Sequence, residues 1–292
     1  HSMLTTFDPR VTIKHADDDQ DPKNKVFSLV IQRENLKRMQ QKVHDPNPEA
    51  KTCNVISFIG DTHSGKSFLI RELLKRFPRR SRHKEQTDVE SDVQPRVADE
   101  DCDEPTSANC NYYLATMKLG GDDNDGGEMI DTIFLDMEGN SGQDYVPGDE
   151  TNKEVGGLEY YEQRRNSVKQ HLPRLAYVTS HLVVYLSELD DSNAKYAKEA
   201  VKIASRCALN GVVNAEKPSL LLVHNKVNRM NAAVSVDTST NKFMEGNKSQ
   251  MEELGTRYEA VKYVKIPFFD PDDSPKKKEV FEKQMEELTH CM

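Results

Sequence analysis

The segment that most constrains this chain is residues 60–67, Gly-Asp-Thr-His-Ser-Gly-Lys-Ser, which match the phosphate-binding pattern G-x-x-x-x-G-K-[ST] at every fixed position. The pattern has meaning only between a buried strand and a helix. Residues 54–59 form a short apolar run rich in β-branched side chains, and residues 67–77 carry apolar side chains at helical spacing. The sequence therefore predicts a strand, a loop and a helix that bind the phosphates of a nucleoside triphosphate.

The residue types of this loop suit that chemistry. Glycine lets the backbone turn its N–H groups toward phosphate oxygens, and the positive end of the helix dipole adds to the attraction. Lys66 would reach the β and γ phosphates, and the Ser67 hydroxyl can ligate Mg²⁺, which prefers hard oxygen ligands. The alternative is an ordinary glycine-rich turn between a strand and a helix. The candidate nucleotide-binding residues of the segment are Gly60, Asp61, Thr62, His63, Ser64, Gly65, Lys66, Ser67 and Phe68.

Composition argues against several other classes of protein. Of the 292 residues 30% are charged and 36% hydrophobic, and no apolar run approaches the roughly 20 residues of a membrane-spanning helix. The net charge of -9 argues against nucleic acid as the main partner, because a phosphate backbone attracts basic surfaces. The five cysteines include no C-x-x-C pair and no histidine at zinc spacing. We expect reduced thiols in a cytoplasmic protein.

The order of apolar runs and turn signals predicts an α/β fold. Residues 1–49 are expected to be a lead-in, polar over residues 4–23, with a strand at residues 26–31 and a helix at residues 34–43. Residues 50–292 are expected to form one domain with three layers and a mostly parallel six-stranded sheet that has one antiparallel edge hairpin. Further strands are predicted at residues 111–117, 129–135, 181–186, 219–223 and 263–268. Helices are predicted at residues 158–180, interrupted at Pro173, and at 193–209, 248–261 and 276–288, with a polar loop at 229–246.

Two further motifs follow the loop in order. Asp136-Met137-Glu138-Gly139 ends an apolar strand, and Asn225-Lys226 follows a later one. With the loop, these motifs resemble the set found in regulatory GTPases. The D-x-E-G form, the G-K-S-F-L continuation and a long first switch segment are most similar to the large GTPases of the dynamin superfamily, in the guanylate-binding, atlastin and very-large-inducible branch. The resemblance covers roughly residues 50–270.

The resemblance implies roles for particular residues. Asp136 would hold Mg²⁺ through water, and the N–H of Gly139 would contact the γ phosphate. A switch threonine that ligates Mg²⁺ corresponds to Thr106, which follows the acidic segment 84–105. The metal set would then be Ser67, Thr106 and Asp136, with a nucleotide-dependent homodimer formed through the face of the domain that binds GTP. The bland alternative for the acidic segment is a solvated surface.

Three positions depart from the family pattern. Asn228 stands where N-K-x-D has aspartate, and an amide offers guanine one acceptor and one donor where a carboxylate offers two acceptors, so discrimination among purines, xanthine included, is expected to relax. Asn140 stands where small GTPases carry a water-orienting glutamine, and Gln143 is the nearer candidate by chemistry. His63 stands where guanylate-binding proteins carry an arginine, and its alternative role is to cap the loop.

The function expected from these residues is Mg²⁺-dependent GTP binding and hydrolysis to GDP. Lys66, Thr106, Gly139 and Gln143 are the candidate catalytic residues, and Asn225, Lys226 and Asn228 the candidate base-reading residues. The rival is a nucleotide-binding scaffold with little or no hydrolysis, favoured by Asn140 and Asn228. A weaker third reading is an ATPase or kinase of the same loop class, for which the chain has no arginine-rich lid.

Overall fold

The computed structural model describes residues 12–15, 27–30, 53–77, 95, 110–119, 128–139, 153–188, 195–208, 216–227, 236–269, 272 and 274–292. The chain divides into two compact units. Unit 1 comprises His1–Ile56 and Lys66–Leu172, and unit 2 comprises Ser57–Gly65 and Pro173–Met292. The boundary expected between residues 49 and 50 stays a prediction.

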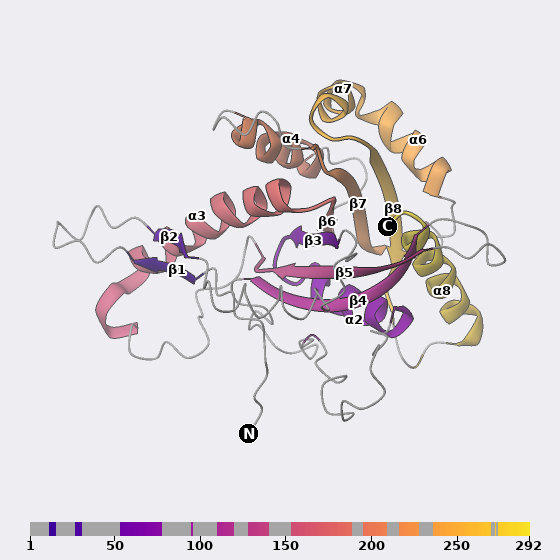
Figure 1. Cartoon of the computed structure of the whole chain (residues 1–292), viewed down its shortest axis with the longest axis horizontal. Helices are drawn as coiled ribbons and strands as arrows, with labels where there is room; N and C mark the ends of the chain where they lie inside the picture. The colour runs from indigo at the N-terminus through magenta and orange to yellow at the C-terminus, as the bar shows by residue number, and fades with distance from the viewer. Residues whose placement is uncertain are drawn as a thin grey trace. The chain divides into compact units, whose positions relative to one another are not determined.

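A six-stranded sheet has the order β4-β5-β3-β6-β7-β8 (Figure 1). Its strands are β3 (Asn54–Gly60), β4 (Cys110–Leu119), β5 (Glu128–Met137), β6 (Leu182–Ser187), β7 (Ser219–Val227) and β8 (Val261–Pro267). β6, β7 and β8 pair in parallel, whereas β4 and β5 form an antiparallel hairpin at one edge. The predicted α/β fold, with a mostly parallel six-stranded sheet and one antiparallel edge hairpin, is confirmed.

In unit 2, β6 and the first part of β7 are continuous apolar runs. Every residue of β6 is buried, and β7 is buried from Leu220 to Asn225. A parallel strand covered on both faces has no polar side to alternate with, so it is an unbroken hydrophobic run in the sequence. The strands predicted at residues 181–186 and 219–223 are therefore confirmed, although β7 continues to Val227.

In unit 1 the helix that follows the loop packs against the edge hairpin. α2 (Lys66–Arg76) contacts β5 and buries Leu69, Ile70 and Leu73, which lie on one helical face. The helix predicted over residues 67–77 is thus confirmed within one residue at each end.

Unit 1 also contains a two-stranded antiparallel sheet of β1 (Thr12–His15) and β2 (Phe27–Val30). β2 confirms the strand predicted at residues 26–31. β1 lies within the polar lead-in, where no strand was predicted, because four residues are too few to show a strand period and β1 exists through its pairing with β2. The helix predicted at residues 34–43 lies outside the described residues.

The longest helix, α3 (Lys153–Thr179), contains Pro173 without ending there. The predicted interruption of this helix at Pro173 was wrong. Proline removes one bond to the carbonyl four residues earlier, here that of Lys169, whose residue is exposed so that water can replace the missing donor. Among the helices of the described residues, none is long and apolar enough to cross a membrane.

The helices of unit 2 are α4 (Lys195–Ala208), α6 (Val236–Gly246), α7 (Lys248–Arg257) and α8 (Pro275–His290). The loop predicted at residues 229–246 was wrong over α6. Few of its residues favour a helix, but Phe243 is buried and stacks on Tyr263 of β8 with ring centroids 4.6 Å apart. Tertiary packing therefore overrides local propensity. The remaining predicted helices and β8 exist, with ends that differ by up to four residues.

A threonine of α6 closes the outer side of β8. The Thr240 hydroxyl accepts a hydrogen bond from the Tyr263 N–H at 3.0 Å and donates one to the Tyr263 carbonyl at 3.1 Å. β8 is the last strand of the sheet order, so these backbone groups face no neighbouring strand of that sheet. The side chain replaces the partner that a further strand would supply.

Candidate functional site

The loop of residues 60–67 runs from the end of β3 to the start of α2. Its backbone leaves ordinary strand geometry at Gly60, His63 and Gly65, which have φ angles of 142°, 62° and 87°. The Ser64 N–H donates to the Asp61 carbonyl at 3.3 Å, which closes a turn. The helix thus begins at Lys66, with its first N–H groups next to the turn, as phosphate binding at a helix N-terminus requires.

Two glycines of the loop are required by space as well as by conformation. A Cβ at Gly60 would lie 2.1 Å from the Leu186 carbonyl oxygen of β6. A Cβ at Gly65 would lie 2.4 Å from the Asn225 side-chain nitrogen. Both contacts are far shorter than real ones, and positive φ angles add strain for any residue with a Cβ. The fixed glycines of the pattern are therefore explained by contacts within unit 2.

The start of α2 meets the end of β5 within unit 1. The Ser67 hydroxyl donates to Asp136 Oδ2 at 2.7 Å, and the two residues are 6% and 1% exposed. Lys66, beside Ser67, is also buried. Asp136 is the penultimate residue of β5, which ends at Met137. Glu138 and Gly139, which follow the strand, are both buried. Two of the three metal ligands expected from the sequence are thus in direct contact.

This pair fits a magnesium ion by the chemistry of its donors. A hydroxyl and a carboxylate are hard oxygen ligands, and Mg²⁺ is held in nucleotide sites by few protein ligands together with phosphate oxygens and water. Ser67 and Asp136 are the residues that would hold it. Thr106, the third expected ligand, lies outside the described residues.

A buried thiol neighbours the Asp136 carboxylate. Cys110 of β4 lies one position from the residue that pairs with Asp136 and is buried. Burial, and then the negative charge of Asp136, raise the pKa of the Cys110 thiol to about 12. Both residues are buried, so ionisation of the thiol would place a second negative charge beside Asp136 out of contact with water.

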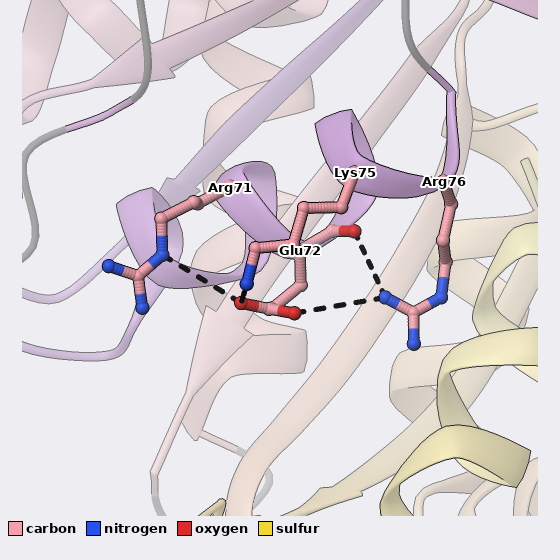
Figure 2. Close-up of polar contacts among 4 residues, drawn as sticks. All are labelled: Arg71, Glu72, Lys75 and Arg76. Carbon is pink, nitrogen blue, oxygen red and sulfur yellow. Dashed lines mark hydrogen bonds and ion pairs between the residues drawn. The ribbon is translucent and has the colours of Figure 1, made fainter. Parts of the chain in front are cut away.

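Glu72 of α2 lies among three basic side chains of the same helix (Figure 2). Glu72 is buried, and its carboxylate lies 2.6 Å from Lys75 Nζ and within 4 Å of Arg71 and Arg76 nitrogens. Arg76 also donates to the Glu72 carbonyl at 2.9 Å. A partly desolvated carboxylate with three cationic neighbours is well satisfied, so this cluster stabilises the helix behind the loop.

In unit 2 the end of β7 bonds to the loop backbone. The Asn225 side-chain amide donates to the Ser64 carbonyl at 2.7 Å, and Lys226 Nζ donates to the His63 carbonyl at 2.9 Å. Asn225 is buried, whereas Lys226 is exposed and has a φ of 58°. The structure therefore brings both residues to the loop, but within β7 and not after it.

The departure of β7 from regular pairing explains this placement. The register with β8 shifts between His224 and Val227, so the two residues between them are free of the ladder. The positive φ of Lys226 then directs its side chain toward the loop. A strand prediction that ended at Val223 could not contain this irregularity.

Lys226 also forms an ion pair with Glu188 at 2.5 Å. Glu188 follows β6 directly, and the last residue of β6, Ser187, pairs with His224 of β7. Sequence reasoning missed Glu188. The signal was present, because a carboxylate that follows a buried parallel strand lies at the edge where ligands bind.

Four of the residues singled out in the sequence, Thr106, Asn140, Gln143 and Asn228, lie outside the described residues, as does the acidic segment apart from Pro95. Of the others, His63 is exposed, Ser64 is buried, and Asp61, Thr62, Gly65 and Phe68 are half-buried. His63 contributes its carbonyl oxygen to Lys226, and its side chain is directed to solvent.

No protein-family model matches the chain, and a search of curated proteins finds no match.

Proposed function

We propose that the chain binds GTP with Mg²⁺ and hydrolyses it to GDP, as a domain of the dynamin-superfamily type. The observation that carries the proposal is the 2.7 Å bond between the Ser67 hydroxyl and Asp136 at the start of the helix that follows the loop. This bond joins two separate motifs of the sequence through buried groups, which an accidental match of the loop pattern would not require.

The residues would act by positioning and by charge. Loop N–H groups and Lys66 would hold the β and γ phosphates, and the N–H of Gly139 would contact the γ phosphate. Ser67 and Asp136 would hold Mg²⁺, which would neutralise part of the negative charge of the phosphates. Asn225 would keep the loop in shape through Ser64, and Lys226 would lay its aliphatic stem against the base. Thr106 and Gln143 are proposed to complete the switch and orient water.

Phosphate release tests the proposal. The purified protein is incubated with Mg²⁺ and either GTP or ATP, and we expect release from GTP that stops when Mg²⁺ is chelated. Binding of a non-hydrolysable GTP analogue is measured in parallel. A protein that binds no triphosphate contradicts the proposal.

The second candidate is a nucleotide-binding scaffold, favoured by Asn140 at the catalytic position and Asn228 at the base-reading position. Its signature is analogue binding without phosphate release. In either case we propose a cytoplasmic protein, supported by free thiols at Cys53, Cys110, Cys207 and Cys291 among the described residues. A nucleotide-dependent homodimer is also proposed, and its test is the mass in solution with and without the analogue.

A further inference from the structure

Lys226 is held by two oxygens that belong to different parts of unit 2. Its ammonium group donates to the His63 carbonyl at 2.9 Å and pairs with the Glu188 carboxylate at 2.5 Å. The pairing of Ser187 with His224 places Glu188 beside the irregular end of β7. Because both side chains are more than a third exposed, at 38% and 42%, the ion pair adds little to stability. Its position suggests a role in binding.

The base-reading motif lacks the acceptor that guanine needs. Guanine presents two donors, N1–H and N2–H, and Asn228 offers one acceptor oxygen and one donor nitrogen. Each carboxylate oxygen has two lone-pair sites, so a carboxylate that already pairs with a lysine can accept further hydrogen bonds. Glu188 is the carboxylate that the structure places on the motif lysine.

We infer that Glu188 is a specificity residue that accepts the N1–H and N2–H of guanine and so replaces the missing aspartate. The inference rests on the proposed function and deepens it. Adenine presents an acceptor, N1, at the equivalent edge, and xanthine replaces the N2 amino group by an oxygen, so the carboxylate disfavours both. The relaxed selectivity expected from Asn228 alone is thereby offset.

An aromatic side chain provides a surface for the base on the other side of β7. The Phe268 N–H donates to the Val227 carbonyl at 3.3 Å, directly beyond the pairing of Val227 with Pro267. The Phe268 side chain is 45% exposed, although it is large and apolar. An exposed ring at the carboxyl ends of parallel strands suits stacking on a flat base, which contributes affinity without regard to the polar edge.

The experiment compares nucleotides that differ only at the base edge. Non-hydrolysable GTP, inosine, xanthosine and adenosine triphosphate analogues are titrated calorimetrically with Mg²⁺ into the full chain and its variants. We expect the parent to prefer GTP over the inosine analogue, which lacks the N2 amino group. Glu188→Gln should weaken GTP about tenfold, bring GTP and inosine affinities together, and change ATP affinity less than about twofold.

Three further variants separate selectivity from general effects. Glu199→Gln breaks an exposed lysine–glutamate pair of the same kind, Lys202 to Glu199 at 2.7 Å on α4, and should change nothing. Phe268→Ala should weaken all the purine nucleotides alike. Asn228→Asp in the Glu188→Gln background should recover the preference for GTP, because it restores a carboxylate to the motif.

Two outcomes overturn the inference while leaving the proposed function intact. If Glu188→Gln weakens GTP and ATP equally, Glu188 only positions Lys226. If it changes neither affinity, the carboxylate does not meet the base. A parent protein that binds none of the analogues overturns the proposed function, and the inference with it.

Discussion

The Ser67–Asp136 hydrogen bond in unit 1 and the Lys226–Glu188 ion pair in unit 2 are both polar contacts to a carboxylate. The first contact is buried and the second is exposed to solvent. In unit 1 Ser67 and Asp136 are 6% and 1% exposed, whereas in unit 2 the Lys226 and Glu188 side chains are 38% and 42% exposed. A hydrogen bond in a poorly screened site is strong and costly to lose, while a solvated ion pair contributes little. The buried group is therefore set by the fold, and the exposed group remains available to be reorganised by a ligand.

The largest effect should come from a substitution of Lys66, which is buried beside Ser67. Lys66→Ala removes a cation that would contact two phosphates, and charge-assisted hydrogen bonds are each worth ~1.5 to 3 kcal/mol. We expect affinity for a non-hydrolysable GTP analogue to fall by more than about a hundredfold, measured by calorimetric titration. Lys75→Ala, on the same helix but half exposed, should bind as the parent does. Equal affinity of Lys66→Ala and the parent would refute the phosphate-loop interpretation.

A substitution at Gly60 tests whether the backbone of the loop can tolerate a side chain next to β6. Gly60→Ala places a Cβ against the Leu186 carbonyl at a φ of 142°, so it should lower the free energy of unfolding by ~2 to 3 kcal/mol. Chemical denaturation measures this change. Gly255→Ala is the matched control, because nothing lies within 4 Å of its added Cβ in α7, and it should stabilise by up to ~1 kcal/mol. A tolerated Gly60→Ala would mean that β3 and β6 can separate at this point.

The pH dependence of the free energy of unfolding probes the buried surroundings of Asp136 through the neighbouring Cys110 thiol, and it needs no ligand. Because the Cys110 pKa rises from 9.0 to about 12 on folding, the unfolded chain loses this proton first as pH rises. The contribution of the thiol is fully present below pH 9 and declines as pH rises toward 12, by about 1 kcal/mol at pH 9.5. Cys110→Ala should make the decline shallower in denaturation experiments between pH 8 and about 10. An unchanged slope would show that the thiol does not titrate in this way.

The smallest effect on stability should come from the exposed pair. In a double-mutant cycle of Lys226→Met and Glu188→Gln, we expect a coupling free energy below ~0.5 kcal/mol for unfolding, because solvent screens both groups. Chemical denaturation at low and at moderate salt provides the measurement. A coupling above about 2 kcal/mol would erase the contrast between the two groups and make the pair part of the framework.

The sequence predicted the parts of the molecule that depend on neighbours along the chain. The loop, α2 and the strands of unit 2 follow from patterns of a few consecutive residues, and the antiparallel hairpin follows from the glycine-rich turn between β4 and β5. Those parts depend on local geometry, so the spacing of apolar residues and turn residues along the sequence is enough to predict them.

The parts that escaped prediction depend on contacts between distant residues. α6 forms because Phe243 meets Tyr263, and its polar sequence gives no sign of that contact. The bond of Lys226 to Glu188 requires β6 and β7 to be neighbours, with a register shift at the end of β7. Thr106 and Asn228 were chosen by likeness to a family and Gln143 by the chemistry of its side chain, and all three remain predictions.

The hydroxyl of Thr240 has a consequence for assembly. A chain that offered an extended segment to β8 would find both backbone groups of Tyr263 already bonded to that hydroxyl. Growth of the sheet across this edge would first have to displace the threonine, which protects the protein from polymerising strand by strand. One side chain thus sets a limit on the sheet that is usually set by charge or by proline.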